Sequence, residues 1–151
     1  MTTDVKSTEK QMVLFELNAE TYGLDIAAIR EIIRMQEITQ VPRAPAFVEG
    51  VINLRGKVVP VISLSAKLGL SRSKETKNNR IVVVDLSGST VGVIVDAVSE
   101  VVRISDNVIE PASEIVVAKS TDFLRGIAKV SGKMVILLDL DRMLSKDNLM
   151  G

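Results

Sequence analysis

The sequence of 151 residues predicts an all-β fold with short helices, in which two related units pack together as one rigid body. Short apolar runs rich in valine and isoleucine, such as Ile81–Val84, are typical of strands. Turn-forming residues separate these runs, and the same pattern occurs twice along the chain. Because a unit of about 60 residues is only marginally stable alone, we expect the two units to share an apolar seam.

The repeat is visible when two pairs of segments are overlaid without gaps. Val13–Ile33 matches Val82–Val102 at an offset of 69, and Gly50–Leu68 matches Gly126–Leu144 at an offset of 76. The identical pairs are Val13 and Val82, Leu17 and Leu86, Thr21 and Thr90, Gly23 and Gly92, Ala28 and Ala97, Glu31 and Glu100, then Gly50 and Gly126, Gly56 and Gly132, Lys57 and Lys133, Val59 and Val135, Leu64 and Leu140, Leu68 and Leu144. The order and spacing favour a duplicated supersecondary unit over two unrelated β-rich stretches.

Each unit is expected to contain two hairpins and about four or five strands. The first strands are Gln11–Leu17 and Arg80–Leu86, and the turns of the later hairpins are Leu54–Lys57 and Val130–Lys133. Each of these later turns contains a glycine, which tolerates the positive φ of a tight turn. Pro60 cannot donate a backbone hydrogen bond, so its strand is expected at a sheet edge or at a bulge.

Short helical turns are expected at Ala27–Ile33 and Ser65–Leu70, and Asp141 is expected to cap a last helix that runs through Leu149. The predicted organisation is a flexible tail over 1–10, a first unit over 11–70, a connector over 71–79, a second unit over 80–144 and a terminal segment over 145–151. An exchange of strands at the boundary between the units stays open.

Composition excludes several classes of function. The chain has no cysteine and no histidine, so thiolate sites, histidine ligands and the commonest general base are missing. Lysine plus arginine and aspartate plus glutamate balance at 19 each, which argues against general binding of nucleic acid. No apolar stretch approaches the length of a membrane span, and the polar start lacks the core of a secretory signal. We expect a cytoplasmic protein that is not an enzyme, has no cofactor and does not insert into a membrane.

A few charged residues could carry function. Arg55 occupies the tip of a predicted hairpin among apolar neighbours, where its guanidinium can donate several hydrogen bonds to a partner or simply remain solvated. Asp139 and Asp141 share one face of a strand, but helix capping by Asp141 explains them better than a metal site. Glu31 and Glu100 are equivalent in the repeat and are expected to be solvated carboxylates.

The segment Phe47–Gly56, FVEGVINLRG, followed by Val59–Leu64, VPVISL, resembles the CheW family of chemotaxis coupling proteins. Tyr22–Ile26 resembles the first hairpin of the family and Val91–Asp96 its counterpart, so that the resemblance extends from about Gln11 to Leu144. It implies two tandem five-stranded SH3-like β-barrels and an adaptor without chemistry of its own.

The resemblance also implies partners: the cytoplasmic tip of a chemoreceptor, the CheW-like regulatory domain of the histidine kinase CheA, and rings with CheA or with further copies of the chain. Such a protein would be recruited to receptor arrays at the membrane. By the same resemblance, the residues that form or support the receptor-facing groove are Ile29, Glu31, Gly50, Asn53, Arg55 and Val98. Ile115 and Phe123 would contribute to kinase or ring contacts.

Other interpretations stay open. Within the family, the chain could be the coupling portion of a CheV-like protein or an isolated kinase regulatory domain, although its length leaves no residues for the additional domains of either. Outside the family, a small barrel could bind a peptide or an oligonucleotide on its own.

Overall fold

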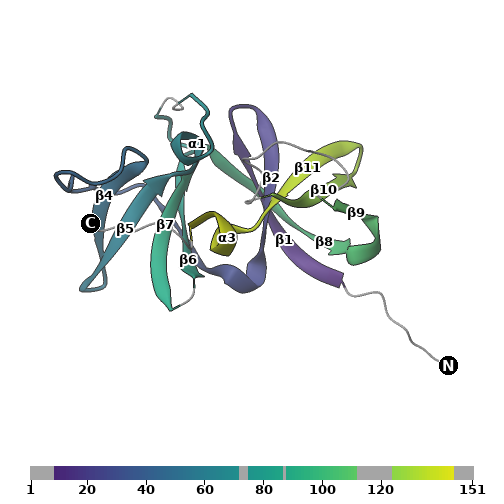
Figure 1. The fold of residues 1–151 in the computed structure, drawn as a ribbon, viewed down its shortest axis with the longest axis horizontal. Helices are drawn as coiled ribbons and strands as arrows, with labels where there is room; N and C mark the ends of the chain where they lie inside the picture. Colours follow the sequence, from purple (N-terminus) through teal and green to yellow (C-terminus); the bar gives the residue numbers. More distant parts are fainter. Residues whose placement is uncertain (1–8, 72–74, 87, 112–123, 145–151) are drawn as a thin grey trace.

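The protein consists of two β-sheet lobes side by side, seen in a computed structural model that describes residues 9–71, 75–86, 88–111 and 124–144 (Figure 1). The first sheet has the order β8-β1-β2-β11-β10-β9 and forms the six-stranded lobe, and the second has the order β3-β6-β7-β5-β4 and forms the five-stranded lobe. The predicted all-β class is confirmed, although one lobe has six strands rather than five. None of the helices in these described ranges is long and apolar enough to cross a bilayer.

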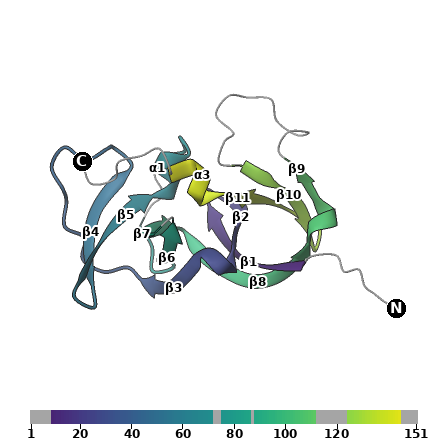
Figure 2. The ribbon, with the colours of Figure 1, turned by 60° about the horizontal axis from the view of Figure 1, so that its bottom comes forward.

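The strands and short helices have the following bounds: β1 Glu9–Leu17, β2 Glu20–Asp25, η1 Ile26–Ala28, β3 Ile29–Arg34, β4 Val48–Leu54, β5 Lys57–Ser63, α1 Leu64–Lys67, β6 Arg80–Leu86, β7 Ser89–Val95, β8 Ala97–Ser105, η2 Asp106–Val108, β9 Ile109–Pro111, β10 Leu124–Val130, β11 Lys133–Leu138 and α3 Leu140–Leu144. Figure 2 shows how the six-stranded sheet curls into a barrel-like ring.

Each lobe contains strands from both halves of the sequence. The β1–β2 hairpin, from the half predicted as 11–70, lies between β8 and β11 in the six-stranded lobe. In return, the β6–β7 hairpin, from the half predicted as 80–144, lies between β3 and β5 in the five-stranded lobe. The exchange is made through two parallel pairings, β11 with β2 and β5 with β7. The exchange that the sequence left open therefore involves whole hairpins.

The strand registers repeat at the same offsets as the sequence. In these pairs each residue of one lobe is related to its counterpart by 69 or 76 positions. The pairs are Phe15 with Tyr22 and Val84 with Val91, Asn53 with Val58 and Lys129 with Met134, Gly23 with Leu137 and Gly92 with Val61, Phe15 with Val98 and Val84 with Ile29. Strand pairing was not used to find the repeat in the sequence. The agreement between the strand registers and the sequence offsets therefore supports a structural duplication.

The two lobes share one apolar core. A single cluster of buried side chains includes Phe15 and Tyr22 from the six-stranded sheet together with Val82 and Val93 from the five-stranded sheet. The rings of Phe15 and Tyr22 are stacked with their centroids 5.9 Å apart. Each lobe also has a smaller cluster of its own on the other face of its sheet. The expected apolar seam is thus present, and it is the largest of the three clusters.

Several local predictions were wrong or only partly right. The helical turn predicted at Ala27–Ile33 occupies only the start of that segment: the 3-10 helix η1 ends at Ala28, and from Ile29 the chain is strand β3, paired with β6. Pro60 lies in β5, an interior strand, but the pairing of β5 with β7 begins only at Val61. Pro60 lies just outside the β5–β7 ladder, so no hydrogen bond of that ladder needs an N–H from the proline.

The last described helix is capped by a different residue from the one predicted. The Oδ1 atom of Asp139 accepts the backbone N–H of Arg142 at 3.2 Å, while Asp141 lies inside the first turn of α3. The helix begins at Leu140 rather than after Asp141, which moves the cap two residues upstream.

Candidate functional site

The turn between β4 and β5 holds Arg55 in a fixed exposed position. Arg55 has φ 54° and Gly56 has φ 82°, the pair of positive values that a two-residue type I′ hairpin turn requires. The Oδ1 atom of Asn53 accepts the N–H of Gly56 at 2.8 Å and closes the turn. The side chain of Arg55 is 70% exposed, so its conformation is set by the turn and by its polar partner rather than by packing.

That partner is Glu31, whose position depends on a bulge in β3. The pairing of β3 with β6 shifts between Ile29 and Glu31, which leaves Arg30 as the extra residue. Before the bulge, Ile29 packs against the shared core; after it, Glu31 lies opposite Val83, a member of the separate core of the five-stranded lobe. The bulge therefore puts the Glu31 side chain, which is still 23% exposed, on the face of the sheet that bears Val83.

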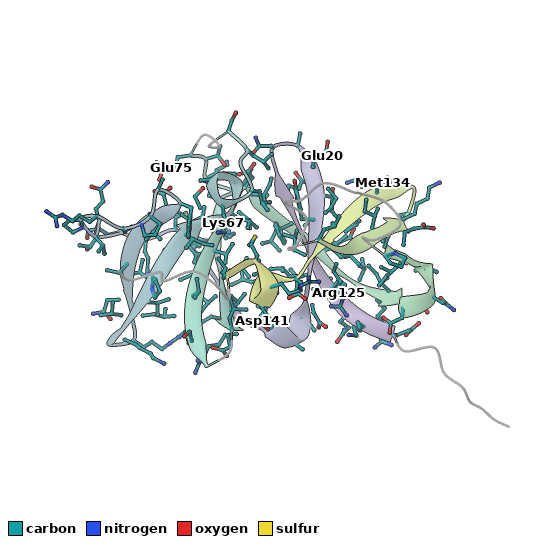
Figure 3. The ribbon with its side chains drawn as sticks, in the orientation of Figure 1. Glu20, Lys67, Glu75, Arg125, Met134 and Asp141 are labelled. Atoms are coloured by element: carbon teal, nitrogen blue, oxygen red, sulfur yellow. The ribbon has the colours of Figure 1, made fainter. Side chains whose placement is uncertain are left out.

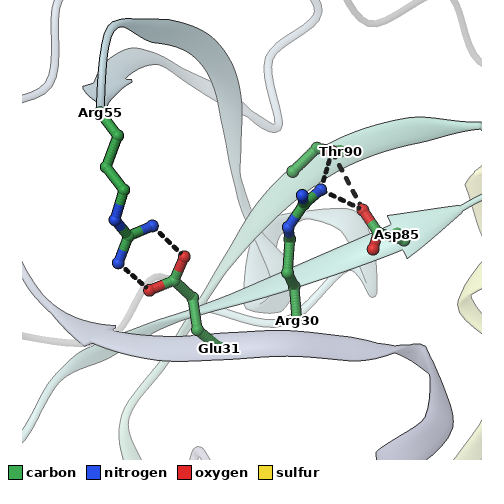
Figure 4. A network of polar contacts seen from close by, with 5 residues as sticks. All are labelled: Arg30, Glu31, Arg55, Asp85 and Thr90. Atoms are coloured by element: carbon green, nitrogen blue, oxygen red, sulfur yellow. Dashed lines mark hydrogen bonds and ion pairs between the residues drawn. The ribbon is translucent and has the colours of Figure 1, made fainter.

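Arg55 and Glu31 form a bidentate ion pair (Figure 4). The two guanidinium nitrogens donate to the two carboxylate oxygens at 2.5 and 2.7 Å. This hydrogen bonding holds the pKa of the Glu31 carboxyl below its ordinary value of 4.5, and it raises the pKa of Arg55 further. Two of the five N–H groups of the Arg55 guanidinium donate to Glu31, so three remain to recognise a carboxylate or a backbone carbonyl of a partner.

A second polar network lies beside the first, and sequence reasoning missed it. Arg30 donates to Asp85 at 3.2 Å and to Thr90 at 3.4 Å, and the Thr90 hydroxyl donates to Asp85 at 3.0 Å (Figure 4). Arg30, Glu31, Arg55 and Thr90 line one shallow pocket. The only signal in the sequence was the identity of Thr90 with Thr21 in the repeat, because the bulge that exposes Arg30 has no signature of its own.

The structure places the six residues of the expected receptor set in different surroundings. Glu31, Asn53 and Arg55 meet at the β4–β5 turn. Ile29 on β3 and Val98 on β8 are repeat equivalents, and both pack partly buried against the shared core. Gly50 is buried in β4, away from the turn. Of these six residues, therefore, three form an exposed polar group and the others pack into or against the scaffold.

Gly50 has a structural reason for being glycine. Its φ is +145°, and a Cβ built there would lie 2.2 Å from the carbonyl oxygen of Thr39. The backbone of Thr39 pairs with Val51 at this point through two hydrogen bonds of 2.8 and 2.9 Å. Because Gly50 has no side chain, the segment that contains Thr39 can approach β4 and pair with it.

The second lobe offers an internal comparison for the ion pair. Its equivalent turn has the same backbone, with Ser131 at φ 51° and Gly132 at φ 81°, but serine replaces the arginine. Glu100, the equivalent of Glu31, lies on β8 opposite Leu14. Because the same turn forms without arginine, the fold does not require Arg55.

The described residues hold no candidate catalytic or metal centre. Within the described ranges there is no group of three or more acidic side chains placed to hold a metal ion. Asp139, one of the two aspartates weighed as a cation site, is engaged as the cap of α3. Ile115 and Phe123, expected at kinase or ring contacts, lie outside the described residues.

Comparisons with known proteins agree with this arrangement. A family model described as a CheW-like domain matches residues 11–148. The chain is 36% identical over 132 residues to the chemotaxis protein CheW of Rhizobium meliloti, covering 87% of this chain and 85% of that one. It is 34% identical over 149 residues to CheW of Bacillus subtilis, covering 98% and 94%. The crystal structure of the scaffolding protein TtCheW from Thermoanaerobacter tengcongensis superposes with a TM-score of 0.85 at 42% identity, covering 93% and 95%.

Proposed function

Because this chain belongs to the CheW family of chemotaxis proteins, a family of non-catalytic scaffolds, we propose that it couples the cytoplasmic tip of a chemoreceptor to the regulatory domain of the kinase CheA. In this role it works in the cytoplasm and is recruited to receptor arrays at the membrane. The coupling needs no covalent step, since a protein that holds two partners in one geometry lets a rearrangement of one bias the conformational equilibrium of the other.

The observation that carries the receptor side of the proposal is the Arg55–Glu31 pair. Glu31 holds the Arg55 side chain in one conformation through a hydrogen bond of 2.7 Å, although the fold does not need this arginine. The equivalent turn of the other lobe has Ser131 in place of the arginine. Pre-organisation of this kind lowers the entropy lost when a partner binds. We assign Arg55 and Glu31 to the direct receptor contact, with Asn53 holding the turn.

The remaining members of the set support this surface in different ways. Ile29 and Val98 border the shared core, where partly buried apolar side chains from both lobes can meet a helical partner. Gly50 acts through the scaffold, by allowing the backbone of Thr39 to pair with β4. The contacts of Ile115 and Phe123 with the kinase, and rings with CheA or further copies of the chain, are part of the same proposal.

The test is a comparison of Arg55→Ala with Ser131→Ala, which truncates the side chain at the equivalent turn of the other lobe. Titration calorimetry with a receptor cytoplasmic fragment measures both variants. If Arg55 is a central anchor, its truncation costs about 2 kcal/mol of binding free energy, which raises Kd about 30-fold. Ser131→Ala is expected to bind as the unaltered protein does.

Circular dichroism and thermal unfolding accompany both titrations. The Arg55 side chain is exposed, so Arg55→Ala should keep the spectrum of the unaltered protein and nearly the same midpoint. An unchanged receptor affinity in a folded Arg55→Ala protein would defeat the assignment of Arg55 and, with it, the proposed receptor surface.

A further inference from the structure

A separate polar cavity lies at the other end of the five-stranded lobe from Arg55. It forms where β5 leads into α1, whereas Arg55 lies in the turn before β5. From Glu49 to Leu54, five residues of strand β4 separate the two ends by about 17 Å at roughly 3.4 Å per residue. The cavity has a volume of about 390 Å³, within the range of small-molecule sites. Its described lining residues are Met35, Ile38, Glu49, Ser63, Ser65, Glu75, Asn79, Ile94 and Asp96.

The lining of this cavity contains a buried amide with unused donors. Asn79 is only 5% exposed, and its Oδ1 atom accepts the hydroxyl of Thr76 at 3.0 Å and the backbone N–H of Thr76 at 3.4 Å. A backbone N–H can only donate, so these bonds fix which atom of the amide is the oxygen. Across the described part of the chain, the Nδ2 hydrogens of Asn79 meet no acceptor. A buried donor left without an acceptor is costly, and such groups in native proteins call for an explanation.

Two buried hydroxyls lie in the same lining. Ser63 and Ser65 are 6% and 4% exposed, and their Oγ atoms are 3.2 Å apart. Ser63 Oγ also accepts the N–H of Ala66, as the cap of α1. One hydroxyl hydrogen serves the bond between the two serines, whichever of them donates. The other hydrogen finds no acceptor among the residues that the structure describes, so the serines add a further donor beside Asn79.

The rest of the lining has a different chemistry. Glu49, Glu75 and Asp96 bring carboxylates, of which Glu49 already has a polar partner, and no lysine or arginine is found among the described lining residues. Figure 3 shows Glu75 on the α1 side of the lobe. Asp96 is held in place, since its Oδ2 atom accepts the N–H of Asn18 at 2.8 Å. Met35, Ile38 and Ile94 add apolar surface to the same lining.

We propose that this cavity binds a small zwitterion of the α-amino-acid class, with its carboxylate on Asn79 and the serine hydroxyls, its ammonium beside the carboxylates, and an apolar side chain against Met35 and Ile94. An anion alone satisfies the buried donors but meets the negative carboxylates, and a cation alone leaves the donors unpaired. A zwitterion satisfies both sets in one cavity. The inference does not depend on the proposed role in chemotaxis, since no residue of the receptor surface is involved.

The test follows the Asn79 side-chain resonances by nitrogen-edited NMR in the full chain. L-Leucine is titrated to about 20 mM, and sodium acetate and propylammonium chloride, each carrying one half of the zwitterion, are titrated in parallel. A site of this size should bind leucine with Kd of about 1 mM, which is a typical affinity for a weak small ligand. Saturable shifts at Asn79 with leucine, and at least tenfold weaker ones with either half, support the proposal.

Two substitutions separate the site from the fold. Asn79→Asp keeps the oxygen that accepts from Thr76 and removes the amide donors, so leucine affinity, followed in this variant through the backbone amides of Ser63 and Ser65, should fall at least tenfold. Glu75→Gln should weaken binding by about threefold through loss of one nearby charge, while Glu20→Gln, the same change at the end of the β1–β2 turn, should leave it unaltered. Ser65→Ala is the second donor variant if Asn79→Asp fails to fold.

The proposal is overturned if leucine gives no saturable shift, which would mean that solvent alone satisfies the donors. Equal responses to acetate and leucine would also overturn it, because an anion would then suffice. The same holds if folded Asn79→Asp or Ser65→Ala binds leucine as the unaltered protein does.

Discussion

Gly50→Ala should destabilise the protein strongly, because both the backbone conformation of Gly50 and the space around it exclude a side chain. At φ +145° the backbone of Gly50 lies in a region that is essentially restricted to glycine and costs other residues about 1 to 3 kcal/mol. In addition, the new Cβ would lie 2.2 Å from the Thr39 carbonyl oxygen and 2.8 Å from Ile38 Cγ2. Backbone must therefore move, and a shift of a flexible side chain is not enough.

The movement breaks a defined pair of hydrogen bonds. Thr39 and Val51 exchange two backbone bonds of 2.8 and 2.9 Å, and each contributes about 1 kcal/mol net. Together with the backbone strain, the expected loss is about 4 kcal/mol, a large part of the roughly 5 to 15 kcal/mol that holds a domain folded. Urea unfolding measured by circular dichroism should show a lower midpoint with the slope unchanged.

Gly56→Ala is the matched control, because the same atom is added to a glycine of the same hairpin. Gly56 has φ +82°, but nothing lies within 4 Å of its added Cβ. It should lose only the about 1 to 2 kcal/mol of a left-handed residue. If Gly50→Ala loses no more stability than Gly56→Ala, the packing of Thr39 against β4 is not what requires glycine at position 50. Gly50 would then be free to act as a direct partner contact.

Two further outcomes are expected. Phe15→Ala should cost about 3 to 5 kcal/mol and still unfold in one transition, because Phe15 lies in the core that joins both sheets; separate transitions for the two lobes would contradict this. The carboxyl of Glu31 should titrate below 4.5 in carbon-detected NMR, and Arg55→Ala should return it toward 4.5. Since the pKa is lowered in the folded state, the pair's contribution is present above 4.5 and is lost as the pH falls through the folded-state value; an unshifted midpoint would show that the ion pair does not persist in solution.

The duplicated pattern could be predicted from the sequence because the two offsets that align the repeat also relate the paired strands of the two lobes. The overlays at offsets of 69 and 76 align the glycines of the turns and bulges, and those glycines occupy equivalent places in the two lobes. A turn with two positive φ values leaves a local signature such as Arg55–Gly56. Where the backbone itself restricts the residue type, the sequence carries the information.

The exchange of hairpins could not be predicted in the same way. It depends on two parallel pairings, in which Val61 lies beside Gly92 and Leu137 beside Gly23. A Cβ at Gly23 would lie 2.9 Å from the side chain of Leu137, and a Cβ at Gly92 would lie 3.3 Å from that of Val61, so each glycine leaves room for its parallel neighbour. The repeat identified both glycines, but it gave no indication of which distant strand each would face. Parallel partners are joined by long connections, so local patterns do not specify them.

The site was only partly predictable for a related reason. Arg55 could be singled out because a turn is a local feature, and Glu31 because it is repeated as Glu100. The contact between Arg55 and Glu31 depends on the bulge at Arg30, which reverses the faces of β3. A strand read with strict alternation would place Ile29 and Glu31 on one face, whereas the bulge puts Ile29 against the shared core and Glu31 opposite Val83, on the other face of the sheet.

The duplication itself explains how one small scaffold can present two unlike surfaces. In Figure 1 the β4–β5 turn and the β10–β11 turn lie at opposite ends of the view, the first at the lower left and the second at the upper right. Both turns have the same backbone, but one carries Arg55 and the other Ser131. Substitutions at such exposed turn positions change the surface without disturbing the shared core. The shared core around Phe15 fixes the distance between the two ends. Each end can therefore change its exposed side chains without moving the other. Such an arrangement suits a protein proposed to hold two different partners.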